Sequence, residues 1–342
     1  MNNYEEKYKE YVRLLNMSYK DAVATLITKY GTVTDNYYVE ISYQKFLNSE
    51  IFGITKGKYQ KTKDGLYCHH IMEDRYENLS NEEFIKNGRY PYKTQLAENL
   101  VYCNAIEHLI LHVLISEQTK GEFGTKGLVF YIQPEVIYWY SDKIEPTAKW
   151  KQVCKAQAYI PDYLFYKFIL KVLDKLKENT KYIEYNKENN FTVELMEEIF
   201  NMLLRNYEKE LKEKSERMTF LNISEDEYNE NKEQILREEQ LMNEAKKIYT
   251  SLEEIKNSKV PRQVVINILA YLGSLVPGHY LNSYTSDTLK KNKINVVKDV
   301  LIEEIKEVST PIIHEIENMK YYDVRVNKIP TELIKKINSR VF

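Results

Sequence analysis

The chain has 342 residues, of which 49 are basic and 51 acidic, so its net charge of −2 gives no indication of a polyanionic partner. At roughly 150 residues per domain, this length predicts two domains with sizeable cores. The charged N-terminal segment MNNYEEKYKEYV has no apolar core, and no later run approaches the ~18 apolar residues of a membrane span. The sequence therefore predicts a cytoplasmic protein with no membrane partner.

The three cysteines are an odd number and form no CxxC pair. This spacing argues against a disulfide framework. Cys68 and Cys103 fall on two predicted strands, where we expect small buried residues, because free cysteines are usually buried.

The first predicted element is an amphipathic helix over residues 4–30. Its apolar residues recur at intervals of three and four, and Gly31 is a typical end signal. The next stretch, DNYYVEISYQKFL, alternates loosely and fits a strand or irregular structure.

Four of the six histidines lie between residues 66 and 112. His69 and His70 follow a short apolar run that predicts a buried strand. His108 and His112 lie in NAIEHLILHVLI, where Asn104 can cap a helix and the spacing of four places both imidazoles on one helical face. Because neighbours on a regular strand point to opposite faces, the chain must bend at the first pair if all four rings are to meet.

These residues suit a single metal ion. Neutral imidazole is a common ligand of divalent metals, and a catalytic site uses about three protein ligands with a position left open. The alternative for the pair on the helix is equally simple, because two such histidines can be partly buried and hydrogen-bonded without a metal.

Asn99 completes a pattern that resembles the HNH nuclease motif. It lies nine residues before His108 and precedes a strand-like LVYC, as in the His-rich motif of colicin-type DNases. A broader resemblance to compact bacterial and phage HNH proteins covers roughly residues 10–160, although the paired cysteines of many such proteins are missing. The resemblance implies an α+β fold with a ββα-metal finger over residues 66–116.

Transferred residue by residue, the resemblance assigns the histidines different roles. His69, His108 and His112 would bind the metal, and His70 would be the general base that activates water. Asn99 would hold the loop and orient that base, as second-shell groups do for catalytic imidazoles. The ion would be Mg or Mn in turnover, while Zn or Ni would also fit three imidazoles.

The activity that the resemblance implies is metal-dependent hydrolysis of DNA phosphodiester bonds, leaving 5′ phosphates. Restriction, phage defence and mobile elements are settings in which such domains act. An RNA nuclease or toxin is the first alternative, and a DNA-binding or structural protein that does not cut is the second.

Basic residues flank the motif on both sides. They form the run KGKYQKTK before the first strand and the segment NGRYPYKTQ within a long insertion over residues 73–98. Either they contact phosphates or they are solvated surface, with the tyrosines of the insertion packed on the finger. The candidates for nucleic-acid binding are Lys56, Lys58, Lys61, Lys63, Arg89 and Lys93.

After the helix, the segment GEFGTKGLVFYIQPEVIYWYSD predicts a loop and then a strand. Its glycines lack the spacing of a phosphate-binding loop. The sequence thus predicts an N-terminal nuclease domain over residues 1–160.

Residues 161–342 predict a mainly helical domain for target recognition, partner binding or oligomerisation. Apolar seams at heptad-like spacing run over 193–207 and 241–255, and Ser224 with Glu227 offers a capping box between them. The seams fit an intramolecular hairpin or a homodimer, and we expect a homodimer.

Overall fold

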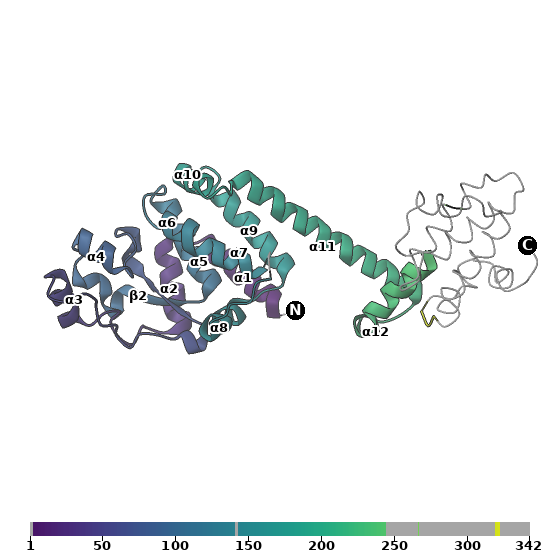
Figure 1. Ribbon diagram of the computed structural model, residues 1–342, viewed down its shortest axis with the longest axis horizontal. Coiled ribbons are helices and arrows are strands. Elements are labelled where there is room, and N and C mark those ends of the chain that lie inside the picture. Colours follow the sequence, from purple (N-terminus) through teal and green to yellow (C-terminus); the bar gives the residue numbers. More distant parts are fainter. Residues whose placement is uncertain (1–2, 141–142, 244–265, 267–318, 322–342) are drawn as a thin grey trace, which may run out of the picture. The chain divides into compact units, whose positions relative to one another are not determined.

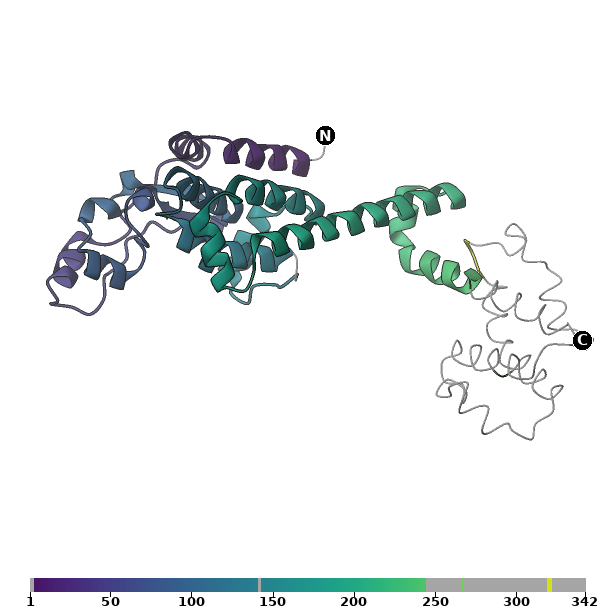
Figure 2. The same ribbon diagram turned by 90° about the horizontal axis from the view of Figure 1, so that it is seen from above.

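The computed structural model describes residues 3–140, 143–243, 266 and 319–321 (Figure 1). These residues are mostly helical and contain one small antiparallel sheet, consistent with the α+β class in its broad sense. The chain divides into two compact units, Met1–Glu210 and Leu211–Phe342. Figure 2 shows the same elements from a second direction.

The N-terminal part of the first unit runs from α1 to α5 and contains the sheet. The elements are α1 (Asn3–Leu15), α2 (Tyr19–Tyr30), α3 (Glu40–Leu47), η1 (Thr62–Asp64), β1 (Tyr67–His70), η2 (Ile71–Asp74), α4 (Glu82–Gly88), η3 (Tyr92–Gln95), η4 (Ala97–Asn99), β2 (Leu100–Cys103) and α5 (Ala105–Gln118).

The rest of the described chain is helical. The elements are α6 (Thr125–Gly127), the π-helix η5 (Leu128–Ile132), α7 (Gln133–Tyr140), α8 (Lys149–Ala158), α9 (Asp162–Leu176), α10 (Thr180–Glu188), α11 (Val193–Leu221) and α12 (Glu225–Glu230).

The N-terminal helix predicted over residues 4–30 is two helices. The chain leaves helical geometry after Leu15, and Ser18 starts α2 by accepting a hydrogen bond from the backbone N–H of Asp21. The predicted end at Gly31 is confirmed, since its φ of 79° lies in the left-handed region that glycine tolerates. The spacing of apolar residues continues across the break, so periodicity alone could not reveal that the segment forms two helices.

The sheet consists of β1 and β2, paired so that His69 lies opposite Val101 and His70 opposite Leu100. An isolated pair of strands is marginally stable, and here α2 and α5 pack on the sheet. All four residues of β2 are buried. The first strand ends at His70, where the chain turns into η2, so the bend expected at the histidine pair is present.

Helix α5 is the centre of the main hydrophobic core. It packs against α1, α2, α8 and α9, and it is apolar around most of its circumference, as a fully enclosed helix must be. The predicted cap is confirmed: Asn104 and Glu107 form a reciprocal capping box.

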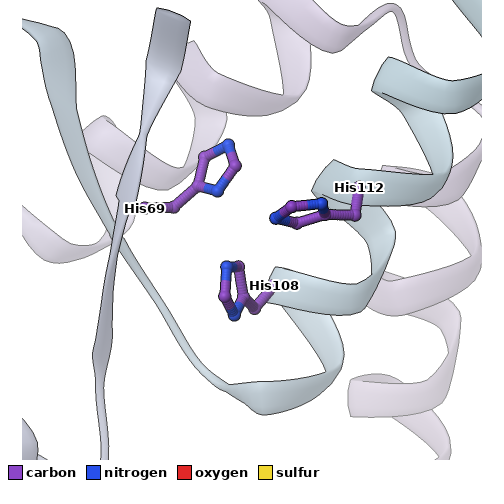
Figure 3. A group of neighbouring side chains, drawn as sticks. All are labelled: His69, His108 and His112. Atoms are coloured by element: carbon purple, nitrogen blue, oxygen red, sulfur yellow. The ribbon is translucent and has the colours of Figure 1, made fainter. Parts of the chain in front are cut away.

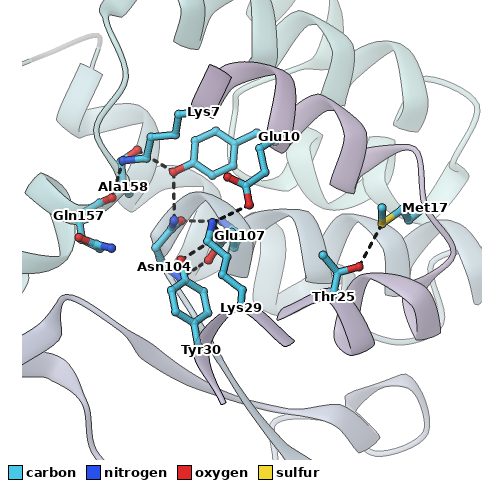
Figure 4. A network of polar contacts seen from close by, with 11 residues as sticks. Lys7, Glu10, Met17, Thr25, Lys29, Tyr30, Asn104, Glu107, Gln157 and Ala158 are labelled. Carbon is cyan, nitrogen blue, oxygen red and sulfur yellow. Dashed lines mark hydrogen bonds and ion pairs between the residues drawn. The ribbon is translucent and has the colours of Figure 1, made fainter. Parts of the chain in front are cut away.

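A buried polar network fixes this end of α5 (Figure 4). The carboxylate of Glu107 accepts hydrogen bonds from the ammonium of Lys29 at 2.8 Å, the hydroxyl of Tyr30 at 3.1 Å and the backbone N–H of Asn104 at 2.7 Å. The Asn104 amide donates to the hydroxyl of Tyr11. The network sets where α5 begins and therefore where its two histidines lie.

The segment predicted as a loop and a strand after α5 is helical instead. It forms α6, η5 and α7, with Leu128 and Val129 fully buried against the core. The run LVFYI favours a strand by local propensity, but packing against α5 overrides that preference.

The first unit extends beyond residue 160, the boundary expected from the sequence. Helix α9 packs on α1 and α5, and Val193, Met196 and Phe200 of α11 are buried in the same core. The first apolar seam therefore contributes to the fold of its own chain. The second seam, 241–255, lies mostly outside the described residues.

In the second unit, Ser224 caps α12 by accepting from the backbone N–H of Glu227, which is one half of the predicted capping box. Residues 232–243 are helical, and Glu238 accepts hydrogen bonds from the backbone N–H groups of Lys320 and Tyr321. Nowhere in the described part of the chain is a helix both long and apolar enough to cross a bilayer.

Candidate metal centre

Three of the predicted site residues meet in one group. His69 at the end of β1 faces His108 and His112 on α5, and the ring nitrogens that can serve as ligands all lie within 4.8 Å of one another (Figure 3). Nitrogens around a tetrahedral ion lie about 3.4 Å apart, so small side-chain rotations suffice. The three residues can therefore hold a metal ion.

A hydrogen bond fixes the protonation of His69. Its Nε2 lies 2.9 Å from the hydroxyl of Tyr19, which donates its own hydrogen to the carbonyl of Ile71. The hydroxyl therefore accepts from Nε2–H, and the lone pair of His69 is on Nδ1. That atom is buried without a hydrogen-bond partner, as expected of an imidazole nitrogen that serves as a metal ligand.

The ring of His112 is held from the other side by the turn after α5. Its Nδ1 donates to the carbonyl of Gly124 at 3.0 Å, which leaves Nε2 for the interior of the site. A Cβ on Gly127 would lie 2.9 Å from the ring, so glycine lets the end of α6 approach this closely. The glycines of this segment thus position an imidazole.

Glu73 is the site residue that the sequence did not reveal. Its carboxylate lies 3.1 Å from Nε2 of His112 and 3.8 Å from Nδ1 of both His69 and His70. A carboxylate oxygen and an imidazole lone pair repel one another at such distances unless a proton or a cation lies between them. The cluster therefore needs a positive charge at its centre.

The ring of His70 is set by Gln95. The amide nitrogen of Gln95 donates to Leu79 and Thr94, so its oxygen accepts from Nε2–H of His70 at 3.1 Å. The Nδ1 lone pair of His70 then faces Glu73. An imidazole with a lone pair on Nδ1 is able to accept a proton.

Asn99 does not contact His70 in the structure. Its amide donates to the backbone carbonyl of Lys93 at 2.7 Å and closes the turn that carries Gln95. This hydrogen bond is compatible with the loop-holding role predicted for Asn99, whereas the residue that hydrogen-bonds to His70 is Gln95.

The predicted basic residues lie outside this cluster. Lys56, Lys58, Lys63, Arg89 and Lys93 are exposed. Lys61 instead packs over the ring of Tyr102 at 4.3 Å and donates to the carbonyl of Tyr30. Nucleic-acid binding by these residues stays a prediction.

Burial favours the neutral form of three of the imidazoles, those of His69, His70 and His108. It lowers the pKa of His69 well below 6.5 and that of His70 in the same direction, and in both cases Glu73 partly opposes the effect. Burial together with neighbouring His112 lowers the pKa of His108 to about 3. Burial alone would raise the pKa of Glu73, but the hydrogen bond and charge of His112 outweigh it and hold that pKa far below its usual range. Neutral rings at His69 and His108 and an ionised carboxylate at Glu73 are the forms in which these side chains bind metals.

The group opens into a cleft of about 540 Å³. His69 and His70 lie at its floor with 1% and 2% of their surfaces exposed. Its walls come from the connection between the strands and from α6 and η5.

Comparisons of the chain with protein-family models, with curated proteins and with solved structures find no significant match in any of the three. They identify no family, so membership of the HNH nucleases stays a prediction from the motif. The function of the chain must be inferred from the chemistry of these side chains.

Proposed function

We propose that the chain is a metal-dependent endonuclease of the HNH type, with DNA as its substrate and a ββα-metal finger formed by β1, β2 and α5. The observation that supports this most is the pairing of a three-imidazole group with a separate imidazole, His70, whose free Nδ1 faces the same carboxylate. One group can bind a cation while the other accepts a proton.

In this scheme His69, His108 and His112 would hold the ion. When bound, a divalent ion supplies charge stabilisation to the phosphate and to the leaving 3′ oxygen. Mg or Mn would serve in turnover, and Zn or Ni would also fit the donor set.

The chain's own residues handle the proton. Nδ1 of His70 takes it from the attacking water, while Gln95 keeps Nε2–H in place. Glu73, 3.8 Å from Nδ1, stabilises the positive charge that the ring acquires. Asn99 positions the turn on which Gln95 lies.

Partners follow from the same proposal. DNA would be held at the exposed lysines before β1. A homodimer would need a surface other than Val193, Met196 and Phe200, because these residues are buried within their own chain.

The test is incubation of the purified protein with supercoiled plasmid and with RNA, each in Mg, Mn, Zn or EDTA. We expect metal-dependent conversion of plasmid to nicked or linear DNA that carries ligatable 5′ phosphates. His70→Ala, prepared in parallel, controls for contaminating nucleases. Cleavage of RNA alone would indicate an RNA nuclease, and no cleavage with any ion would indicate a protein that does not cut.

A further inference from the structure

The walls of the cleft are aromatic on two sides. Tyr76 and Phe84 line it from the connection between β1 and β2, and Phe130 and Tyr131 line it from η5. Neither segment belongs to the strand–strand–helix group that holds the histidines. None of the four rings is among the candidate metal ligands, so they are available for another purpose.

The rings on η5 are unusually open to solvent. Tyr131 has 67% and Phe130 37% of its surface exposed. Phe130 is supported from behind by the ring of Tyr185, whose centroid lies 5.8 Å away. The segment is a π-helix, a conformation that is rare and common at functional sites. An exposed aromatic pair beside a catalytic floor is a surface on which planar groups can stack.

Charge in the cleft does not suit a polyanion held mainly by its phosphates. Among the described lining residues, Lys126 alone carries a permanent positive charge, and it is paired with Glu77 at 3.0 Å. Glu73 adds a second acidic group. Surfaces that bind duplex DNA are strongly basic, because phosphate contacts dominate duplex affinity.

The depth of the site restricts the shape of the substrate. His70 is almost completely buried, so a phosphate must enter the cleft to meet it. A volume of about 540 Å³ lies within the range of roughly 300–1,000 Å³ that small ligands occupy. One or two nucleotides of a single strand fit such a space, and a base-paired duplex fits it less well.

We propose that the cleft binds unpaired nucleotides of a single-stranded nucleic acid, with bases stacked on Tyr131 and Phe130 and the backbone lying over His70. Stacking is tolerant of sequence and supplies affinity where phosphate contacts are few. The identity of the chemistry at His70 rests on the proposed function, but strand binding by the aromatic wall does not.

Binding is tested with the full chain freed of metal, so that no cleavage interferes. Fluorescence anisotropy would compare labelled single-stranded oligo-dT, single-stranded oligo-U and a blunt duplex of equal length. We expect each single strand to bind at least about ten-fold more tightly than the duplex. Tyr131→Ala should weaken single-strand binding by about five-fold or more, since one stacked base is worth that much.

Matched variants separate stacking from loss of structure. Tyr131→Phe keeps the ring and should retain affinity. Tyr138→Ala removes an equally large ring, 51% exposed on α7, that does not line the cleft, and should leave affinity unchanged. Tyr131 is chosen for substitution instead of Phe130, because its greater exposure means that the alanine variant should keep the fold. Thermal melting of the variant checks that it is folded.

Equal or tighter binding of the duplex would overturn the proposal, as would wild-type affinity in Tyr131→Ala. If single strands bind through the ring of Tyr131 but no substrate is cut, this inference is supported and the proposed function fails. If plasmid is cut but binding does not depend on that ring, the proposed function is supported and this inference fails. Preference between oligo-dT and oligo-U identifies which sugar the wall accepts.

Discussion

Two carboxylates with little exposed surface lie near α5, and they differ in how many hydrogen-bond donors they have. Glu107, with 1% of its surface exposed, accepts from Lys29, from Tyr30 and from the backbone of Asn104. Every partner is a donor, so the charge is fully compensated. Such a network stabilises one conformation of the chain.

Glu73 has no comparable set of donors. It faces the imidazoles of His69, His70 and His112. The ring nitrogen of His69 that lies nearest to it, Nδ1, has no hydrogen-bond partner. Buried polar atoms are almost always paired in folded proteins. The contrast indicates that the Glu107 network serves the fold, whereas the cluster around Glu73 is able to hold a cation.

The largest expected effect separates the ligands from the base. His112→Ala should abolish metal binding and cleavage together. His70→Ala should retain the metal but lose about 10²–10⁴-fold in cleavage rate, because it removes only the proton acceptor. Calorimetry with Zn or Mn on both variants decides the roles. If His70→Ala loses the ion as completely as His112→Ala, the roles of His69 and His70 are reversed.

Glu107→Ala should destabilise the protein by about 2–4 kcal/mol, since it leaves the hydroxyl of Tyr30 and the buried backbone N–H of Asn104 without their acceptor. Urea unfolding measures this. Glu10→Ala is the matched control: Glu10 binds the same lysine at 2.8 Å but is 35% exposed, so its loss should cost under about 1 kcal/mol. Equal losses of unfolding free energy in the two variants would show that the buried Glu107 contributes no more to stability than the more exposed Glu10.

Acid should lower the free energy of unfolding of the metal-free protein, because the histidines of the cluster must take up protons on unfolding. Folding lowers the pKa of His69, His70 and His108, so below pH ~6.5 the unfolded chain binds protons that the folded chain does not. Stability is then lost as pH falls, by about 1.4 kcal/mol per pH unit for each such histidine. Glu73, whose pKa is lowered, adds its own loss only below its unfolded value near about 4.3.

Unfolding in urea between pH 7 and about 4.5 tests this slope. His108→Asn should reduce it by one histidine's share, because it removes one titrating ring. An unchanged slope in that variant would show that His108 titrates alike in the folded and unfolded states.

The smallest effect concerns the lysines before β1. Lys56, Lys58 and Lys63→Gln should weaken DNA binding and reduce the salt slope by about 0.7–0.9 for each phosphate that a lysine no longer neutralises. Lys61 is excluded, because its packing on Tyr102 makes it part of the fold. Lys9, Lys177 and Lys181, which form exposed surface ion pairs, provide a control of equal charge. The same salt slope in both triple variants would mean that the lysines before β1 are solvated surface residues that contact no phosphate.

The sequence predicted the elements whose signals are local. The histidine spacing, the Asn104 cap and the end at Gly31 each depend on neighbours a few residues away. Glu73 had a local signal as well, since it follows His69 by four residues and His70 by three. The sequence predicted residue 73 as the start of the insertion and not as part of the site, and only the turn into η2 brings the three side chains together.

Other parts of the site have no local signal. Tyr19 reaches His69 across 50 residues of sequence, and Gln95 reaches His70 across 25. The closeness of Gly127 to His112 depends on η5 being helical, which the apolar and aromatic run did not predict. Tertiary packing decides each of these contacts.

The most direct test of the account is a measurement of metal binding. Calorimetric titration of the metal-stripped chain with Zn or Mn should show one ion per chain, with a rise in melting temperature that EDTA reverses. The same titration of His69→Ala, which removes the unpaired Nδ1, should show no specific binding. A wild-type chain that binds no ion and melts identically in EDTA would contradict the account, because a proton shared between His112 and Glu73 would then be the only positive charge that the cluster holds.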